Sequence, residues 1–198
     1  MTSSKENDWP ALPDGLVIEK ELHGESGAFG HVFAVRDERA GKDRSVSRIV
    51  RVLKSNGSLA DWKTPLRERL ASLAGLPLPF AATPIEWGEL ENGSIYIVGN
   101  HLGSRIRDSI GNDKGLDVTR VRNYAFQLLN GLAALHARDI AHGDIRPENL
   151  FLDPHKEPSD SKSVWIADAE IGGLVAWSGN VAFSHPEACH YRPPEWNG

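Results

Sequence analysis

The stretch that most constrains this chain is HGDIRPENL at residues 142–150, which two further apolar residues follow. It places a carboxylate, Asp144, and a carboxamide, Asn149, five residues apart, with the cation Arg146 between them. A carboxylate can accept the proton of an attacking hydroxyl, an amide oxygen can ligate a metal ion, and a cation can hold a transferred phosphate. The stretch therefore predicts a phosphoryl-transfer site on a short loop between apolar segments.

This loop resembles the catalytic loop of protein kinases, H-R-D-L-x-x-x-N. The resemblance implies that Asp144 is the catalytic base and that Asn149 is a magnesium ligand. Arg146 stands where Ser/Thr kinases commonly carry lysine, and Gly143 replaces the arginine of the motif. Because a guanidinium is a planar fork and an ammonium a compact point charge, the expected phosphate contact of Arg146 has a different geometry.

A glycine-rich turn lies far upstream, at residues 23–30, between two expected strands at 16–22 and 31–35. Its spacing resembles the kinase glycine-rich loop G-x-G-x-x-G-x-V, with Glu25 in place of the first glycine. Glycines in such a turn let backbone N–H groups approach phosphate oxygens, since no Cβ intervenes. The residues that the resemblance assigns to nucleotide binding are Gly27, Gly30 and Val32.

The next expected strand covers residues 45–54, and in the kinase family it carries a lysine that contacts the nucleotide phosphates. The register that fits the family best places Arg51 at that position. Lys54 is the alternative, and it lies on the opposite strand face because side chains alternate along a strand. Either charge also fits an ordinary solvated strand residue. The phosphate contact is therefore assigned to Arg51 or Lys54, with Arg51 favoured.

Leucines spaced by four and three residues predict a helix over residues 61–74. By resemblance, this is the helix whose glutamate pairs with the strand lysine in kinases. Counting along the chain reaches Arg69 at the glutamate position, with Glu68 beside it. The usual ion pair is therefore in doubt in this chain.

A second hairpin is predicted over residues 84–98, and it leads into the segment 99–103. The resemblance makes this segment the hinge between two lobes, where backbone groups of Asn100 and Leu102 would contact the adenine edge. Gly99 would occupy the position that gates the space behind the adenine, and it would leave that space open.

The longest helical pattern covers residues 118–136, where apolar residues form one stripe. This stripe is expected to be core without a chemical role. Its members are Val121, Tyr124, Ala125, Leu128, Leu129, Leu132 and Leu135.

Asp168, Ala169 and Glu170 follow a short apolar segment, at the place where kinases have D-F-G. Asp168 matches the aspartate that holds magnesium. Ala169 removes the aromatic plug of the motif, and Glu170 adds a negative charge near the expected metal. Further on, the residues YRPPE at 191–195 are similar to the A-P-E motif.

The order of these motifs implies an α+β, two-lobed kinase-like fold with a small antiparallel-sheet lobe, one main helix, and a mainly helical second lobe. The expected division is a flexible lead-in at 1–14, an N-lobe at 15–98, the hinge at 99–103 and a C-lobe at 104–198. This C-lobe is expected to be incomplete, because the sequence ends before the further helices of a kinase domain.

Composition limits the partners. The net charge of −5 argues against a nucleic-acid footprint, and one cysteine excludes an internal disulfide framework. No run of about 18 apolar residues and no signal-peptide core occurs, so a cytoplasmic protein without membrane contact is expected.

The resemblance implies an ATP- and Mg2+-dependent kinase that phosphorylates Ser/Thr hydroxyls. The departures at Glu25, Arg51, Ala169 and Glu170 support an alternative, a pseudokinase that binds nucleotide or a protein partner as a scaffold. A small-molecule kinase of the aminoglycoside-phosphotransferase type shares the wording H-G-D and D-x-x-x-x-N, and it is the third reading. Substrate identity and oligomeric state are not specified by the sequence.

Overall fold

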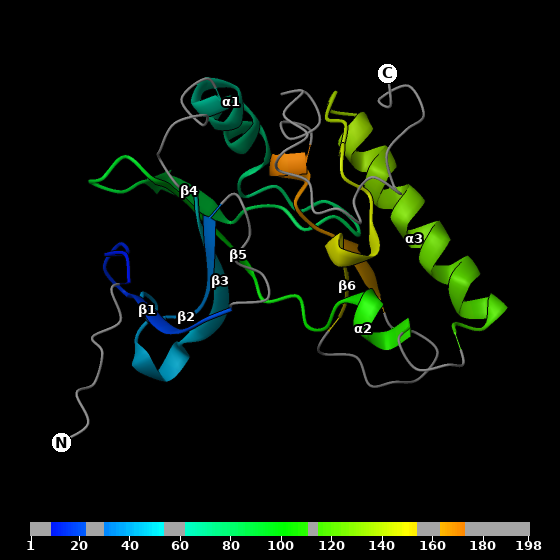
Figure 1. Ribbon diagram of the computed structural model, residues 1–198, viewed down its shortest axis with the longest axis horizontal. Helices are drawn as coiled ribbons and strands as arrows, with labels where there is room; N and C mark the ends of the chain where they lie inside the picture. The colour runs from blue at the N-terminus through cyan, green and yellow to red at the C-terminus, as the bar shows by residue number, and fades with distance from the viewer. Residues whose placement is uncertain (1–8, 23–29, 54–61, 111–114, 154–162, 173–198) are drawn as a thin grey trace.

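The computed structural model describes residues 9–22, 30–53, 62–110, 115–153 and 163–172 (Figure 1). Gly27, Lys54 and the segment 191–195 lie outside these ranges, so the expectations attached to them stay predictions.

The first lobe is a five-stranded antiparallel sheet in the order β1-β2-β3-β5-β4. Alternating β-branched residues favour these strands, because such side chains pack well on a pleated surface. Both expected hairpins and the strand that carries Arg51 are confirmed. The strands are β1 (Leu16–Glu21), β2 (Gly30–Asp37), β3 (Val46–Leu53), β4 (Glu86–Glu89) and β5 (Ile95–Asn100), and a 3-10 helix, η1 (Lys42–Arg44), connects β2 to β3.

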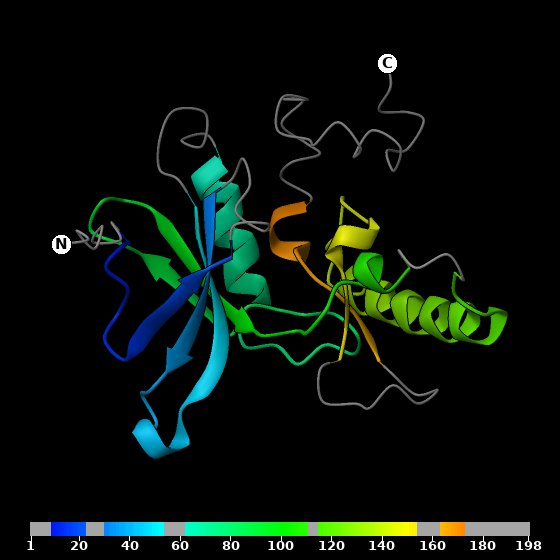
Figure 2. The ribbon, with the colours of Figure 1, turned by 60° about the horizontal axis from the view of Figure 1, so that its bottom comes forward.

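The helix α1 (Lys63–Leu73) packs beside this sheet, as Figure 2 shows. Its leucines Leu66, Leu70 and Leu73 are buried, which confirms the expected spacing. Leu66 and Leu70 share a hydrophobic cluster with Leu53 and Ile95 of the sheet. Burial of each leucine is worth about 2 kcal/mol, so this cluster fixes α1 on the sheet.

The second lobe is built around a two-stranded antiparallel sheet, and it lies beside the first lobe in Figure 2. The longest helix covers one side of it and begins at Asp117, whose side chain accepts a hydrogen bond from the Arg120 N–H at 2.9 Å. Such an N-cap satisfies a backbone donor that the first helical turn leaves unpaired. The elements are α2 (Ile106–Ile110), α3 (Val118–His136), η3 (Pro147–Asn149), β6 (Leu150–Leu152) and β7 (Val164–Ile166).

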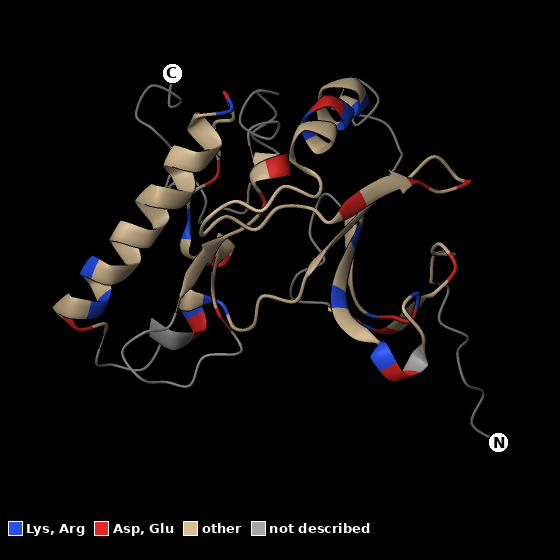
Figure 3. Ribbon diagram, turned by 180° about the vertical axis from the view of Figure 1, so that it is seen from behind, with Lys and Arg blue, Asp and Glu red and all other residues tan. Residues whose placement is uncertain are grey.

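The bounds of α3 agree with the prediction, but its expected core stripe is only partly buried. Tyr124 and Leu135 are buried, whereas Val121 is 49% exposed and Leu129 65% exposed. Periodicity locates an apolar face, but it does not say which neighbours cover it. No described residue covers the outer face of α3, which also exposes Val118 and Phe126, and Figure 3 shows few charges along most of the helix.

Two boundaries differ from expectation. β5 continues through Asn100, so Gly99 and Asn100 of the expected hinge are still paired with β3. The described end of the lead-in is packed rather than flexible, because the ring of Trp9 lies edge-on to that of Phe33, with centroids 6.3 Å apart. Leu12 packs against the same cluster, and aromatic burial of this kind stabilises a segment without regular structure. No helix among the described residues is long and apolar enough to cross a membrane.

Candidate active site

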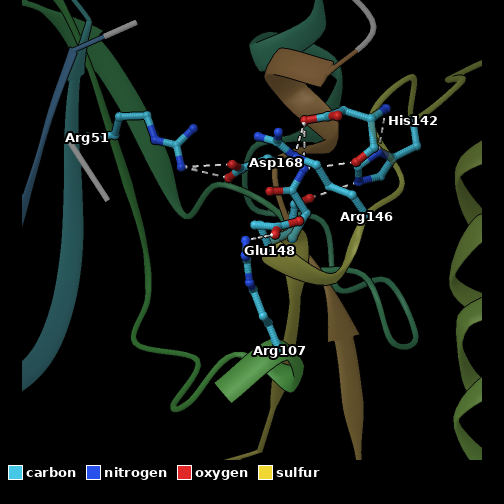
Figure 4. A network of polar contacts seen from close by, with 9 residues as sticks. Arg51, Arg107, His142, Arg146, Glu148 and Asp168 are labelled. Carbon is cyan, nitrogen blue, oxygen red and sulfur yellow. Dashed lines mark hydrogen bonds and ion pairs between the residues drawn. The ribbon is translucent and has the colours of Figure 1, made fainter. Parts of the chain in front are cut away.

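The site lies where three segments meet: the loop that precedes β6, the strand β3, and the segment that follows β7 (Figure 4). The loop is held at its start by His142, whose side chain is 1% exposed. Its Nε2–H donates to the Ala167 carbonyl at 2.8 Å, while its Nδ1 accepts from the Asp144 N–H at 3.2 Å. His142 thus ties the loop to the segment that carries Asp168. Because one ring nitrogen donates and the other accepts, the imidazole is neutral, and burial lowers its pKa.

Asp144 and Asn149 are joined directly. The Asn149 Nδ2 donates to the backbone carbonyl of Asp144 and to its Oδ2, each at 2.8 Å. Asn149 is buried, at 4% exposed, so two bonds hold its side chain in one orientation. The amide oxygen takes part in neither bond, and oxygen is the atom with which an asparagine ligates magnesium.

Arg146 lies beside the same carboxylate, with its Nε 3.2 Å from the Asp144 Oδ2. This Nε is buried and makes no aligned hydrogen bond with any described residue, so its contact with Asp144 is an electrostatic one. The Asp144 carboxylate thus accepts a hydrogen bond from Asn149 and is partly neutralised by Arg146. A carboxylate held in this way is suited to position a hydroxyl group.

Arg51 reaches into the site from β3. Its Nη2 donates to both carboxylate oxygens of Asp168, at 2.8 and 2.9 Å. The register favoured from the sequence therefore brings Arg51 and Asp168 together. Asp168 has a φ of 68°, a left-handed conformation that is uncommon outside glycine, and this places its carboxylate toward β3.

The helix α1 contributes a cation rather than an acid. The Arg69 Nε donates to the Ala169 carbonyl at 2.7 Å, and its Nη2 donates to the Ala141 carbonyl. Glu68, the acid considered for the usual ion pair, is exposed to solvent. In this structure α1 is therefore bonded to the two loops of the second lobe, and no ion pair between α1 and β3 occurs among the described residues.

Residues 169–172 form one helical turn directly after Asp168. Within it, Ala169 is fully buried in the core of the second lobe, while Ile171 joins the cluster of Leu66 and Leu70 under α1. Ala169 replaces the aromatic residue of the D-F-G motif, and the apolar contact expected from that residue is made here by Ile171, two residues later.

Glu170 is also buried, at 7% exposed. Burial raises its pKa, and the negative charge of Asp168 adds to this rise, while Arg51 and Arg69 oppose it. An ionisable side chain this well buried was not expected from the sequence, since glutamates are mostly exposed.

A cavity beside these groups brings together most residues assigned to nucleotide binding. Gly30 does not line the described cavity. A Cβ at Gly30 would lie 2.0 Å from the Val52 carbonyl oxygen, so close packing on β3 accounts for this glycine. The predicted residues that line the cavity are Val32, Arg51, Asn100, Leu102 and Asp168, together with Gly99 and Glu170.

No described group of three or more His, Cys, Asp or Glu side chains is arranged to hold a metal ion. Magnesium is commonly held by one or two protein side chains together with substrate phosphates and water. Asn149 and Asp168 fit that mode by donor chemistry, with an amide oxygen and a carboxylate.

Three residues that hold the site together were given no such structural role from the sequence: His142, Arg69 and Glu170. His142 stands inside the recognised motif, so its position was visible although its bonds were not. The roles of Arg69 and Glu170 depend on tertiary contacts, which no local pattern encodes.

These residues lie together between an antiparallel sheet with one helix and a second, helix-covered lobe. The family model for the protein kinase domain matches residues 20–196. The chain belongs to the protein kinase family, and its two-lobed fold is that of a kinase.

Relatives among curated proteins are Ser/Thr and cyclin-dependent-like kinases. The chain is 35% identical over 81 residues to cyclin-dependent kinase-like 2 of Homo sapiens, covering 41% of this chain and 15% of that protein. It is 42% identical over 71 residues to serine/threonine-protein kinase grp of Drosophila melanogaster, covering 35% of this chain and 14% of the relative. The chain thus matches only a small part of each relative.

Among solved structures, the PknI kinase domain of Mycobacterium tuberculosis has a TM-score of 0.60 with 18% sequence identity. The match covers 80% of this chain and 60% of that one, and it supports the fold.

Proposed function

We propose that the chain binds ATP with Mg2+ between its two lobes and transfers the γ-phosphoryl group to Ser/Thr hydroxyls of proteins. The observation that carries this proposal is the Asp144–Asn149 pair, in which two 2.8 Å bonds fix a carboxylate and an amide on one loop. Asp144 accepts the hydroxyl proton as the oxygen attacks phosphorus, and Arg146 beside it stabilises charge on the transferred group. The family match favours protein substrates over small molecules.

Asn149 and Asp168 are the residues that would hold the metal, which supplies neutralisation of phosphate charge. Val32, Asn100 and Leu102 would surround the nucleoside, and Arg51 would contact its phosphates. A cytoplasmic location stays a prediction.

A second candidate function, a catalytically silent nucleotide- or protein-binding scaffold, is favoured by the bond between Arg51 and Asp168. Arg51 donates to both carboxylate oxygens of Asp168. The residue proposed to bind the metal and the residue proposed to bind the phosphates are therefore bonded to each other. The described walls of the cavity enclose about 100 Å3, below the range of roughly 300–1,000 Å3 typical of ligand sites. Catalysis thus requires Arg51 and Asp168 to separate when nucleotide enters.

The test is the thermal stability of the protein with ATP, in the presence and absence of Mg2+, for the native chain and Asp168→Ala. Specific binding to the folded state raises apparent stability, so a Mg2+-dependent rise is expected that Asp168→Ala abolishes. Asp43→Ala, at an exposed acid of η1, is the matched control and should keep the rise. Transfer of labelled phosphate to a mixed protein substrate then separates a kinase from a scaffold. Nucleotide binding without transfer would favour the scaffold, and no binding would refute the kinase proposal.

A further inference from the structure

A second and larger cavity shares a wall with the nucleotide cavity, because residues 82–84 and 100–102 line both. The rest of its described lining comes from the start of β3, the neighbouring segments at 75–78 and 81–85, Asp153 and Trp165. We call it the rear cavity. Its described walls enclose about 730 Å3, within the range of roughly 300–1,000 Å3 typical of small-molecule sites. The rear cavity therefore has the size of a ligand site.

The wall at residues 75–85 is held in shape by its own hydrogen bonds. The Thr83 Oγ1 donates to the Leu76 carbonyl at 2.6 Å. The Gly75 N–H donates to the Pro84 carbonyl at 2.8 Å. These bonds close the segment on itself, so a ligand would meet a wall that is already formed. Binding to a preformed wall avoids the cost of ordering a loop.

Most side chains that line the rear cavity are apolar. Leu76, Ile85, Leu102 and Trp165 are among them, and each is only partly buried. The ring of Trp165 lies against that of Phe80, with centroids 6.3 Å apart, which restricts its orientation. Partly exposed apolar side chains that gather in a concave site favour a ligand with an apolar body.

Arg48 adds a positive charge to this apolar wall. Its Nη1 donates to the Asn100 Oδ1, which is a neutral acceptor, and its Nε makes no hydrogen bond with any described residue. Asp37, on the neighbouring strand, accepts from Arg39 at both carboxylate oxygens, at 2.8 and 2.6 Å. No described carboxylate forms an ion pair with Arg48. Its charge is therefore available to a ligand carboxylate, which a guanidinium binds by charge-assisted hydrogen bonds.

We propose that the rear cavity binds a small apolar carboxylate. The acid group of the ligand bonds Arg48, and its apolar body packs against Ile85 and Trp165. Asp153, the acid of the described lining, lies after β6 in the second lobe and has contacts other than Arg48. The carboxylate is therefore directed to the first lobe. This site is separate from the proposed phosphoryl transfer and does not depend on it.

The test compares naphthylacetate with its uncharged counterpart naphthylacetamide, by calorimetry on the whole chain. The acid should bind one-to-one with a Kd below about 1 mM, and the amide should bind about tenfold more weakly. Arg48→Gln should weaken binding of the acid about tenfold or more and leave that of the amide within about threefold. Arg48→Lys keeps the charge, so it should bind the acid more tightly than Arg48→Gln. If Arg48 only supports the wall, its loss weakens the acid and the amide equally.

Two control variants locate the probe. Gly99→Leu places a side chain in the nucleotide cavity, where a Cβ would meet no heavy atom within 4 Å, and Gly99 does not line the described part of the rear cavity. It should bind the acid within about threefold of the native chain. Arg67→Gln is the matched loss of an exposed cation that bonds Glu89, and it should also leave binding unchanged.

Any of four outcomes overturns the inference: no binding of the acid to the native chain, equal affinities for the acid and the amide, unchanged affinity of Arg48→Gln for the acid, or loss of binding in Gly99→Leu. The last outcome would place the probe in the nucleotide cavity. The comparison of acid with amide and the Gly99→Leu variant need no change at Arg48. The test therefore stays decisive if Arg48→Gln does not fold, which thermal unfolding of each variant reports.

Discussion

Gly172 is the position where one methyl group should disturb the catalytic loop most directly. A Cβ there would lie 2.4 Å from the His142 carbonyl oxygen and 3.1 Å from the Asp144 Cβ. The first of these neighbours is backbone, so it cannot move aside by a change of rotamer. The substitution Gly172→Ala must therefore displace either the turn at 169–172 or the loop that carries Asp144.

The expected loss of stability follows from two opposing terms. Overpacking of a well-packed site costs about 1–3 kcal/mol. Replacing glycine by alanine in a helical turn recovers up to about 1 kcal/mol of helix propensity. The net loss should be about 1–2 kcal/mol, which lowers the melting temperature by roughly 2–8 °C for a chain of this size. A displacement of about 1 Å at Asp144 should also lower the phosphoryl-transfer rate on the order of 100-fold.

Gly99→Ala is the matched control, because a Cβ there would meet no heavy atom within 4 Å. It is expected to leave stability unchanged or to raise it by up to about 1 kcal/mol. Urea denaturation of the three proteins measures the free energies of unfolding. A phosphate-transfer assay compares the rate of Gly172→Ala with that of the native chain, and Gly99→Ala serves as a control for stability alone because Gly99 lines the nucleotide cavity. The reasoning is refuted if Gly172→Ala matches the native chain in both measurements.

Three further predictions concern the loop and the sheet. Asp144→Asn should lower the transfer rate by about 10²–10⁴-fold while Mg2+-ATP affinity stays within about threefold by calorimetry, and an unchanged rate would contradict the role of Asp144 as base. Asn149→Ala should cost about 1–3 kcal/mol in urea denaturation, because the substitution removes both bonds to Asp144 at a buried position; a loss under about 0.5 kcal/mol would contradict this. Hydrogen bonds from Arg39 lower the pKa of Asp37 from 3.8 to about 2, so Asp37 stabilises the fold above pH 3.8 and this stabilisation is lost as the pH falls toward 2. Asp37→Asn should therefore cost about 1 kcal/mol at pH 7, a value reduced for surface screening, and almost nothing near pH 2; equal losses at both pH values would exclude this explanation.

Much of the fold was predictable because its signals are local. Alternation of apolar residues predicted β2 and β5, which pair with β3 on either side, and the spacing of leucines predicted α1. The site motif was equally local, since Asp144 and Asn149 are five residues apart and bond each other across one turn. The bond between Arg51 and Asp168, which are 117 residues apart, was not predicted, and the phosphate contact assigned to Arg51 stays a prediction.

What the sequence did not give depends on contacts between distant segments. The outer face of α3 has the same periodicity as its buried face, and only the tertiary arrangement shows that Val121 and Leu129 stay exposed. Trp9 was assigned to a flexible lead-in because residues 1–14 are largely polar and contain two prolines, yet it packs against Phe33. Glu170 was interpreted as a charge that disturbs a metal site, and its burial near Arg51 and Arg69 became visible only in three dimensions.

The bonds of Arg69 have a consequence for which positions tolerate change. Both of its acceptors are main-chain oxygens, so the link between α1 and the second lobe does not depend on the side chains at 141 and 169. Ala141 is exposed, whereas Ala169 is fully buried. A saturation scan should therefore find position 69 intolerant, position 169 limited by size, and position 141 permissive to most side chains. Ala141 accepts one of the two bonds that link the lobes, yet a comparison of sequences alone would show its position as unconstrained.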